Sequence, residues 1–396
     1  MLKAQRLSEL TGAVFAQMED ARRRCVARGM KVINLSVGSP DLAPAPHVIQ
    51  TLRDGIEDLG NYGYPMKDMP EFRQAVAGWY RRRFVVELKP ETEVLGLMGS
   101  QEGLAHICLG VVDPGEIVMV PDPGYPIYSA GPLMAGAVLY PLPMVAENDF
   151  LPDLDSIPGE VWRKTRVLVL NYPNNPVSAV AGRDFFEHVV DVARRRKIIV
   201  VHDAAYSELA FDGYRPMSFL EVPGAREVGV EFNSCSKTFN MAGCRVAYLV
   251  GNPEVVAALA EVKAHLDYGI FRPVQQAAIA ALDGPQDVVR EMALTYQRRR
   301  DVLIDGLNRA GWSMPKPKAT MFAWAPVPRG YGSQDFAMTL LERAGVAVVP
   351  GNGFGARGEG YVRIALVQPE EVMREVVDRV AQSGVLEAPI LPWLAP

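Results

Sequence analysis

The sequence predicts an α/β protein with two domains, and three observations lead to this fold class. The chain has 396 residues, which exceeds the size of one comfortable hydrophobic core. Between residues 93 and 250, short β-branched apolar runs alternate with amphipathic stretches, as in a parallel or mixed sheet covered by helices on both faces. Further on, the chain is more helical and has strand-like runs at 321–325, 346–349 and 361–366. We therefore expect a large domain and a second, smaller α/β domain.

The N-terminal region supplies helices and one short strand. Helices are expected at 8–28, 46–59 and 70–84, and a strand is expected at 31–35. This strand leads into the loop VGSPD, where the backbone of Gly38 can approach a ligand. We expect residues 1–45 to form an N-terminal segment that joins the small domain, 46–285 to form the large domain, and 286–396 to form the small domain, with a C-terminal tail at 386–396 that has no interpretation.

Polar residues follow the ends of several expected strands in the large domain. Those strands are expected at 93–98, 116–120, 167–170, 198–201, 228–232 and 246–250, with helices at 101–112, 183–196, 254–265, 272–282 and 286–310. Ser100, Asn175, Asp203 and Lys237 each come soon after a strand end. Ligands of such sheets bind at the carboxyl ends of the strands. These four residues, far apart in the sequence, are therefore expected in one crevice.

Composition and charge exclude several classes of function. The hydrophobic content is 49%, the charged content is 22% and the net charge is −5, so a nucleic-acid partner is not expected. Short basic runs at 22–24, 81–83, 194–197 and 298–300 are interpreted as solvated helix ends or faces. The four cysteines form no CxxC pair, so neither a metal site nor a disulfide framework is expected. With no membrane-spanning apolar run and no signal-like start, we expect a cytoplasmic protein without a membrane partner.

One lysine lies in a segment of small and hydroxyl residues, SCSKTFNMAGCR at 234–245. Lysine is rarely buried, so Lys237 is either a solvated loop residue or a desolvated amine that forms a Schiff base. The SxxK spacing also occurs in serine acyl-transfer enzymes, with Ser234 as the nucleophile. Their partner motifs SDN and KTG are absent from this sequence. The remaining crevice residues must decide between these interpretations.

Together, these residues suit pyridoxal phosphate. Asp203 would keep the pyridine nitrogen protonated, whereas its alternative role is a buried turn cap. The other expected roles are as follows: Lys237 binds the aldehyde carbon, Ser100, Ser234 and Arg245 bind the phosphate, Tyr125 stacks on the ring, and Asn175 and Tyr206 reach its phenolic oxygen. Arg363 would bind a substrate carboxylate, or else is a paired arginine at the edge of the core.

Seven motifs occur in one order along the chain: GSPDL at 38, GSQEG at 99, PDPGYP at 121, NYPNNP at 171, HDAAYSEL at 202, SCSKTFNMAGCR at 234 and YVRIAL at 361. Over about residues 8–384, the sequence closely resembles the class I aminotransferases that use pyridoxal phosphate. The resemblance implies a fold-type I enzyme whose large domain has a mostly parallel seven-stranded sheet. It also implies a small domain formed by both chain ends and a homodimer with shared active sites, in which Tyr62 reaches the neighbour's cofactor phosphate.

Within this family, segments 125–136, 222–226 and 266–271 look most like LL-diaminopimelate aminotransferases and bacterial glutamate-pyruvate aminotransferases. Gln101 departs from the lysine common in relatives and removes a positive charge beside the expected cofactor site. NPVS at 175–178 replaces the common NPTG, and Cys244 replaces a tryptophan.

The expected reaction is transamination between an L-amino acid and a 2-oxo acid, with alanine or LL-diaminopimelate as donor and 2-oxoglutarate or pyruvate as acceptor. Lys237, Asp203 and Tyr206 are the expected catalytic residues, and Gly38, Asn175 and Arg363 are expected to bind substrate. The alternative on the same scaffold is a β-lyase acting on cystathionine-like substrates. A regulator fused to a DNA-binding module is not expected, because the roughly 30 residues that precede Lys31 are too few to form that module.

Overall fold

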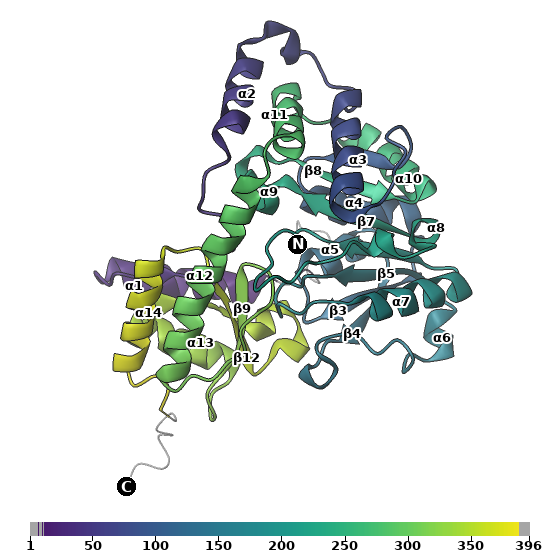
Figure 1. Ribbon diagram of the computed structural model, residues 1–396. Helices are drawn as coiled ribbons and strands as arrows, with labels where there is room; N and C mark the ends of the chain where they lie inside the picture. The colour runs from purple at the N-terminus through teal and green to yellow at the C-terminus, as the bar shows by residue number, and fades with distance from the viewer. Residues whose placement is uncertain (1–6, 8–9, 11, 388–396) are drawn as a thin grey trace.

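Seven strands form the central sheet of the larger part of the molecule in the order β2-β8-β7-β6-β5-β3-β4 (Figure 1). They are β2 Val94–Leu97, β3 Ile117–Asp122, β4 Val138–Pro143, β5 Thr165–Asn171, β6 Ile199–Asp203, β7 Gly229–Ser234 and β8 Ala247–Gly251. Only β8 is antiparallel to its neighbours. The computed structural model describes residues 7, 10 and 12–387, and its mostly parallel seven-stranded sheet confirms the expected fold class.

Both faces of the sheet are buried, which explains the nearly continuous apolar strands. Val167 and Val169 of β5 pack with helices α4, α5 and α10 on one face, whereas Leu168 and Leu170 pack with α7 on the other. The helices of this part are α2 Pro46–Glu57, α3 Pro70–Phe84, α4 Ser100–Val111, α5 Ile127–Met134, α6 Gly159–Trp162, α7 Arg183–Arg196, α8 Ala225–Val228, α9 Cys235–Thr238, α10 Pro253–Leu266 and α11 Arg272–Asp283. Proline lies in the first turn of α2, α3, α10 and α11, where its missing N–H costs nothing.

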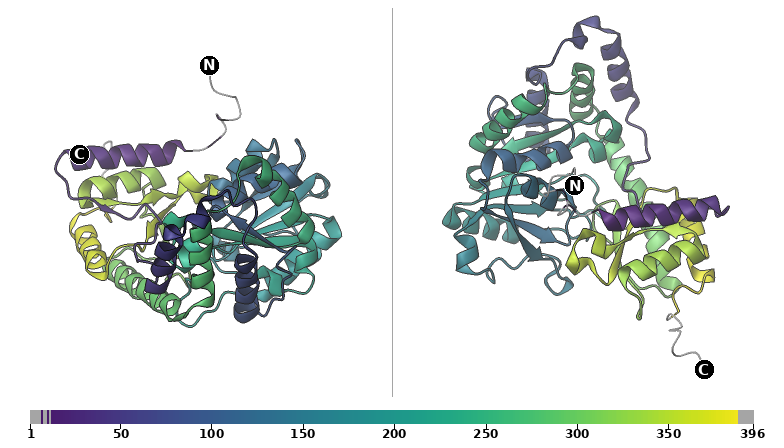
Figure 2. Two further views of the ribbon diagram at one scale, coloured as in Figure 1. Left: turned by 90° about the horizontal axis from the view of Figure 1, so that it is seen from above. Right: turned by 180° about the vertical axis from the view of Figure 1, so that it is seen from behind.

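The smaller part combines both ends of the described chain. Its antiparallel sheet has the order β11-β12-β9, and a separate parallel pair joins β1 to β10. Its elements are α1 Ala13–Ala27, β1 Ile33–Asn34, β9 Phe322–Pro326, α13 Ser333–Ala344, β10 Val346–Ala347, β11 Val349–Pro350, β12 Tyr361–Ala365 and α14 Glu370–Gln382. The long helix α12, Asp287–Arg309, runs from the large part into the small part, and α1 lies across the small part beside α13 (Figure 2).

One sequence-based expectation about these elements is wrong, and one strand was missed. The strand expected at 346–349 is two strands in different sheets, because the chain leaves β1 at Val348 and crosses to β12. The edge strand β4 was not expected, since Pro141 and Pro143 obscure its pattern. The first α-helix begins at Ala13, and the expected start at Ser8 lies outside the described residues, as does tail segment 388–396.

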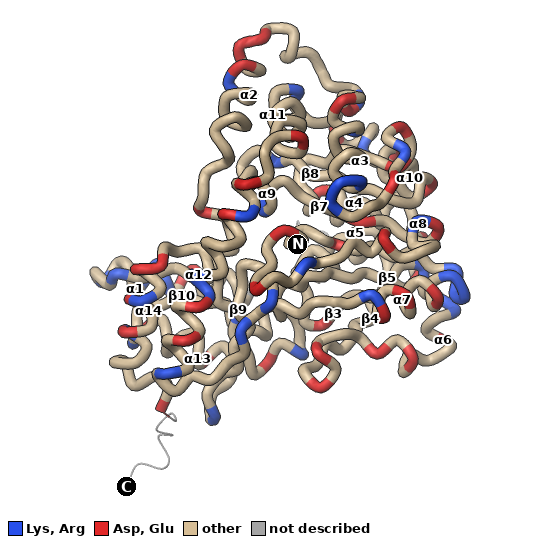
Figure 3. The backbone as a smooth tube through the Cα atoms, viewed as in Figure 1, with Lys and Arg blue, Asp and Glu red and all other residues tan. Residues whose placement is uncertain are grey.

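Charged residues of both signs are distributed along the chain in both parts (Figure 3). The basic runs lie beside acidic residues, as in the pairs Arg194–Glu227 and Arg195–Asp191. The run at 298–300 is not a solvated face, however, because Arg299 and Arg300 are buried and form ion pairs with Asp41 and Asp212. Such pairing compensates for burial of their charges. Within the part of the chain that the structure describes, no helix is long and apolar enough to span a membrane.

Candidate active site

A cavity of about 380 Å³ lies at the carboxyl ends of the central strands, beside β9 and β12 of the small part. Its lining includes almost every residue singled out from the sequence: Gly38, Ser100, Gln101, Tyr125, Asn175, Asp203, Tyr206, Ser234, Lys237, Arg245 and Arg363. The four residues that the strand-end rule was expected to bring together, Ser100, Asn175, Asp203 and Lys237, all line this cavity.

Lys237 lies in the short helix α9, directly after β7. Ser234 begins this helix by accepting a hydrogen bond from the backbone N–H of Ser236 at 3.1 Å. The Lys237 Nζ donates to the carbonyl oxygen of Gly38 at 2.8 Å. Burial, followed by the nearby charges of Arg363 and Arg245, lowers the pKa of Lys237 to about 8. The amine is thus far more often neutral and nucleophilic near pH 7 than an ordinary lysine.

Asp203 ends β6 and is buried at the floor of the cavity. Its Oδ2 accepts a hydrogen bond from the Tyr128 hydroxyl at 2.8 Å, and its Oδ1 accepts one from the backbone N–H of Ala205 at 3.1 Å. Burial raises the pKa of Asp203, while these two hydrogen bonds oppose that rise. The carboxylate is thereby held in one orientation. Sequence reasoning missed Tyr128, which lies in the first turn of α5.

Arg363 comes from β12 and reaches the cavity from the small part. Its Nη1 donates to the Asn175 Oδ1 at 2.9 Å, and its Nη2 donates to the Ser36 carbonyl oxygen at 2.8 Å. The guanidinium lies over the rings of Phe322 and Phe354, at 4.1 and 4.7 Å from their centroids. Burial lowers the pKa of Arg363 to about 10, and its Nε has no hydrogen-bond partner among the described residues.

This arginine has no carboxylate partner in the described part of the chain, so it is not the paired core arginine of the alternative interpretation. A buried cation held only by neutral acceptors is costly unless a ligand anion compensates for it. The guanidinium of Arg363, which lines the cavity, is therefore suited to a carboxylate supplied by a ligand.

The other end of the cavity collects hydroxyl groups, a helix start and one cation. Ser100 begins α4, while Ser234, Ser236 and Arg245 line the same cavity. Gly99, with φ of 85°, precedes Ser100, and a Cβ at Gly99 would overlap the guanidinium of Arg245. Glycine is needed here both for the backbone conformation and for the close approach of Arg245. A helix N-terminus with hydroxyls and an arginine suits a phosphate group.

Two further tyrosines line the space between these ends. The Tyr125 hydroxyl donates to Gln101 Oε1 at 2.9 Å, so Gln101 orients Tyr125. Burial raises the pKa of both Tyr125 and Tyr206, and both phenolic hydroxyl groups therefore stay protonated near neutral pH. The Tyr206 ring packs edge-on against Phe322, with ring centroids 5.7 Å apart.

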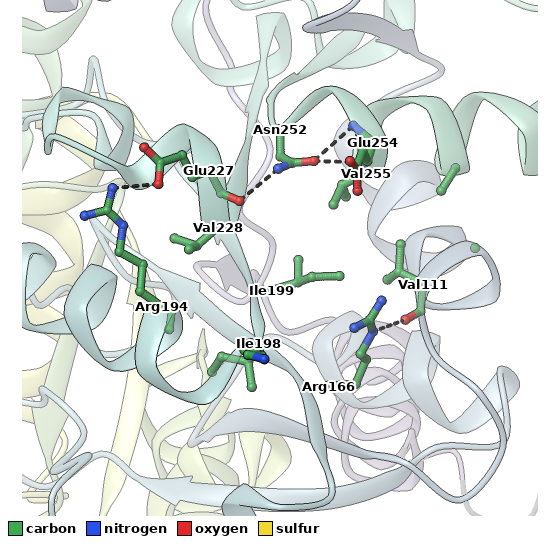
Figure 4. Close-up of a pocket in the computed structure, with 14 residues that line it drawn as sticks. Val111, Arg166, Arg194, Ile198, Ile199, Glu227, Val228, Asn252, Glu254 and Val255 are labelled. Atoms are coloured by element: carbon green, nitrogen blue, oxygen red, sulfur yellow. Dashed lines mark hydrogen bonds and ion pairs between the residues drawn. The ribbon is translucent and has the colours of Figure 1, made fainter.

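Tyr62 does not line the cavity of its own chain. Its side chain is 58% exposed, and its hydroxyl donates to the Ile56 carbonyl oxygen at 2.9 Å. A second cleft, of about 480 Å³, lies on another surface and contains none of the residues expected in the cofactor or substrate site (Figure 4). In it Arg194 pairs with Glu227 at 2.6 Å, and the Arg166 Nε donates to the Val111 carbonyl oxygen at 3.0 Å.

Comparison with known proteins decides the family. The family model described as aminotransferase class I and II matches residues 30–380. The chain belongs to this aminotransferase family. The resemblance seen in its motifs is thereby confirmed, and the protein is a pyridoxal-phosphate-dependent enzyme that catalyses transamination between an amino acid and a 2-oxo acid.

Similar proteins cover nearly the whole length of this aminotransferase. It is 50% identical over 379 residues to the LL-diaminopimelate aminotransferase of Desulforudis audaxviator, covering 96% of this chain and 97% of that protein. It is 51% identical over 379 residues to the enzyme of the same name from Syntrophobacter fumaroxidans, covering 96% and 98%. Among solved structures, a probable N-succinyldiaminopimelate aminotransferase from Thermus thermophilus is 38% identical with a TM-score of 0.89, covering 93% of this chain and 100% of the other.

The cavity of this aminotransferase suits the family's cofactor. The phosphate would meet the start of α4 and Arg245, the ring nitrogen would face the buried Asp203, and the aldehyde would face the partly neutral Lys237. Arg363 lines the same cavity, where its guanidinium would be available to a substrate carboxylate. The donor set is therefore complementary to an anionic pyridine aldehyde and an amino acid together.

Proposed function

We propose that this aminotransferase transfers the amino group of LL-diaminopimelate to 2-oxoglutarate. The observation that carries this proposal is the identity of 50% over 96% of the chain with enzymes named LL-diaminopimelate aminotransferase. An alanine aminotransferase from Pyrococcus furiosus is 26% identical, so alanine is the weaker of the two donors considered. These relatives are named for transamination, which makes it the preferred reaction over β-elimination.

The charges in the cavity support a donor with a zwitterionic distal end. The cations among its described lining residues are Lys237, Arg245 and Arg363. The first is assigned to the aldehyde, the second to the phosphate and the third to the α-carboxylate. Gln101, which is neutral, lies beside Tyr125 where a fourth cation could otherwise lie. A donor with a bare distal carboxylate, such as aspartate, would therefore bind without a cation from this chain.

The assigned roles follow from the contacts of each side chain. When bound, pyridoxal phosphate supplies an aldehyde for amine exchange and a ring that withdraws electrons from the α-carbon. Asp203, fixed by Tyr128, holds a proton on the ring nitrogen. Lys237 Nζ is the base that removes the α-proton, since its pKa of about 8 lies near the working pH. Arg363 binds the α-carboxylate and so orients the α-carbon toward Lys237.

The remaining residues position the ring, Arg363 and Lys237. Tyr125 stacks on the ring in an orientation fixed by Gln101. Asn175 and Tyr206 donate to the phenolic oxygen, and Asn175 also holds Arg363. Gly38 accepts from Lys237 Nζ through its carbonyl oxygen, and it leaves room for the Phe322 ring, which a Cβ at this position would overlap.

We further propose a cytoplasmic homodimer in which Tyr62 reaches the partner's phosphate site. An exposed apolar face supports this assembly: Leu59, Tyr62, Tyr64, Met66 and Tyr268 are each more than half exposed. Tyr64 and Tyr268 pack edge-on with centroids 5.0 Å apart, so the face is preformed. An exposed apolar patch of this kind is typical of a subunit interface.

Sedimentation of two leucine variants tests this interface. Leu59→Arg should give monomers, because it places a charge within the apolar face. Leu109→Arg is the control, since Leu109 is an exposed leucine on α4, outside that face. Dimers of Leu59→Arg as stable as those of the control would contradict the proposed interface.

The substrate proposal is tested by comparing kcat/KM for LL-diaminopimelate, alanine, aspartate and cystathionine, with 2-oxoglutarate as acceptor. LL-diaminopimelate should have the highest value. A preference for alanine or aspartate would overturn the substrate assignment, and release of pyruvate and ammonia from cystathionine as the fastest reaction would support the β-lyase alternative.

A further inference from the structure

Two residues with left-handed backbone conformations contact each other at the junction of the large and small parts. Ser178, in the loop between β5 and α7, has φ of 60°, and Thr320, two residues before β9, has φ of 75°. Both side chains are buried, at 7% and 0% exposure. A β-branched residue in this region is a true conformational outlier, and such strain persists only where surrounding contacts impose it.

The contacts that hold Ser178 and Thr320 in these conformations form a connected network of hydrogen bonds. The Ser178 hydroxyl donates to the Phe322 carbonyl oxygen at 2.8 Å, and the Ser178 and Thr320 hydroxyls lie 2.9 Å apart. Because the Ser178 proton is already committed to Phe322, Thr320 is the donor in the second bond. The Thr320 Oγ1 in turn accepts from the backbone N–H of Phe322 at 3.2 Å.

Backbone hydrogen bonds hold each side of this network to the large part of the molecule. The Ser178 N–H donates to the Asn174 carbonyl oxygen at 3.0 Å, which closes a tight loop around Asn175. On the other side, the Thr320 N–H donates to the Leu209 carbonyl oxygen at 2.7 Å. The two hydroxyls thus join a loop of the large part to the start of β9.

Two of the residues that contact the Arg363 guanidinium are close neighbours of this junction in sequence. Asn175, three residues before Ser178, accepts from the Arg363 Nη1 at 2.9 Å. Phe322, two residues after Thr320, lies under the guanidinium with 4.1 Å to the ring centroid. A displacement of Ser178 relative to Thr320 would therefore move the amide acceptor of Arg363 relative to its aromatic platform.

We propose that Ser178 and Thr320 form a clasp that positions Arg363 for the substrate carboxylate. The clasp residues are positioning residues, since Ser178 and Thr320 do not line the cavity. This inference rests on the proposed role of Arg363. It also gives a physical reason for serine at a left-handed position that glycine would occupy without strain: glycine lacks the hydroxyl that joins the two parts.

Four variants distinguish a role of the clasp in positioning Arg363 from a contribution to folding stability alone. Ser178→Ala and Thr320→Val remove one hydroxyl each, and valine keeps the branched shape of threonine. Thr320→Ser keeps the hydroxyl and is the matched control. Ser178→Gly removes the hydroxyl but relieves the backbone strain, so it should melt at a higher temperature than Ser178→Ala.

The probes are glutamate and 4-aminobutyrate, which differ by the α-carboxylate. Half-reactions of the holoenzyme are followed by visible absorbance, and thermal melting is measured in parallel. Ser178→Ala, Ser178→Gly and Thr320→Val should each raise the KM for glutamate about threefold to tenfold, as expected for the loss of one hydrogen bond. Their kcat for glutamate and their reaction with 4-aminobutyrate should stay near wild type. The KM for glutamate of the double variant Ser178→Ala/Thr320→Val should be no higher than that of the more impaired single variant, because both substitutions remove the same contact.

Arg363→Lys distinguishes the two possible failures. If Arg363→Lys weakens glutamate but not 4-aminobutyrate, whereas Ser178→Ala and Thr320→Val leave the KM unchanged, the clasp is refuted and the role of Arg363 stands. If Arg363→Lys affects both probes equally, the role of Arg363 fails and the clasp proposal fails with it. Recovery of glutamate KM by Ser178→Gly, through strain relief alone, would also overturn the clasp.

Discussion

Replacing Arg363 by lysine tests how the enzyme recognises the α-carboxylate. Arg363 uses two of its five N–H groups on Asn175 and Ser36, and its Nε has no partner among the described residues. A guanidinium gives two parallel hydrogen bonds to a carboxylate, whereas an ammonium cannot reproduce this fork. Since a hydrogen bond to a charged group contributes about 1.5–3 kcal/mol, losing one should lower kcat/KM about 10- to 150-fold.

The assay compares glutamate with 4-aminobutyrate in Arg363→Lys and in a control, Arg300→Lys. Arg300 is also a buried arginine, but it pairs with Asp212 at 2.6 Å and does not line the cavity. The control should lose thermal stability and keep its KM values, whereas Arg363→Lys should lose glutamate turnover selectively. An equal loss for both amines, or no loss for glutamate, would refute the assignment of Arg363 to the carboxylate.

Two further predictions concern Asp203 and Lys237. Asp203→Asn should retain the cofactor's visible absorbance but lower kcat at least about a hundredfold, or about 2.7 kcal/mol of barrier, because an amide cannot hold the ring nitrogen protonated; near-normal turnover would make Asp203 a turn cap only. Because the pKa of Lys237 is lowered to about 8, its neutral fraction grows as pH rises through that value, so cofactor-free protein should recombine with pyridoxal phosphate about tenfold faster at pH 9 than at pH 7 and level off above pH 9. A rate that continues to rise toward pH 10.5, the ordinary pKa of lysine, would contradict this prediction.

Much of the site could be predicted because its residues follow strand ends. Asp203 directly ends β6, and Lys237 comes three residues after β7, so parallel pairing of these strands brings the two together. The place of Arg363 in the site was harder to predict, because its strand belongs to another sheet. Only its charge within the apolar run YVRIAL indicated a functional role. Its two aromatic contacts, with Phe322 and Phe354, come from segments that no sequence pattern connects.

Other features depend on tertiary contacts that local patterns do not contain. Tyr128 appears in the sequence as one more aromatic helix residue, and only the fold places its hydroxyl on Asp203. Arg299 and Arg300 have the composition of a solvated run, but Asp41 and Asp212 from distant segments allow their burial. The left-handed conformation of Thr320 is disfavoured for a β-branched residue. It could not be predicted from the sequence, because it depends on tertiary contacts with Ser178 and Phe322.

Borohydride reduction of the holoenzyme tests the central claim, that Lys237 is the lysine that holds pyridoxal phosphate. Reduction fixes the cofactor covalently to the lysine that binds it, and peptide mapping then locates the label. Lys237 is expected to carry it, because burial lowers the pKa of this amine to about 8 and the amine lies in the same cavity as Asp203 and Arg245. Label on the peptide that contains Lys237 would support every role assigned around it. Label on any other lysine would contradict the account.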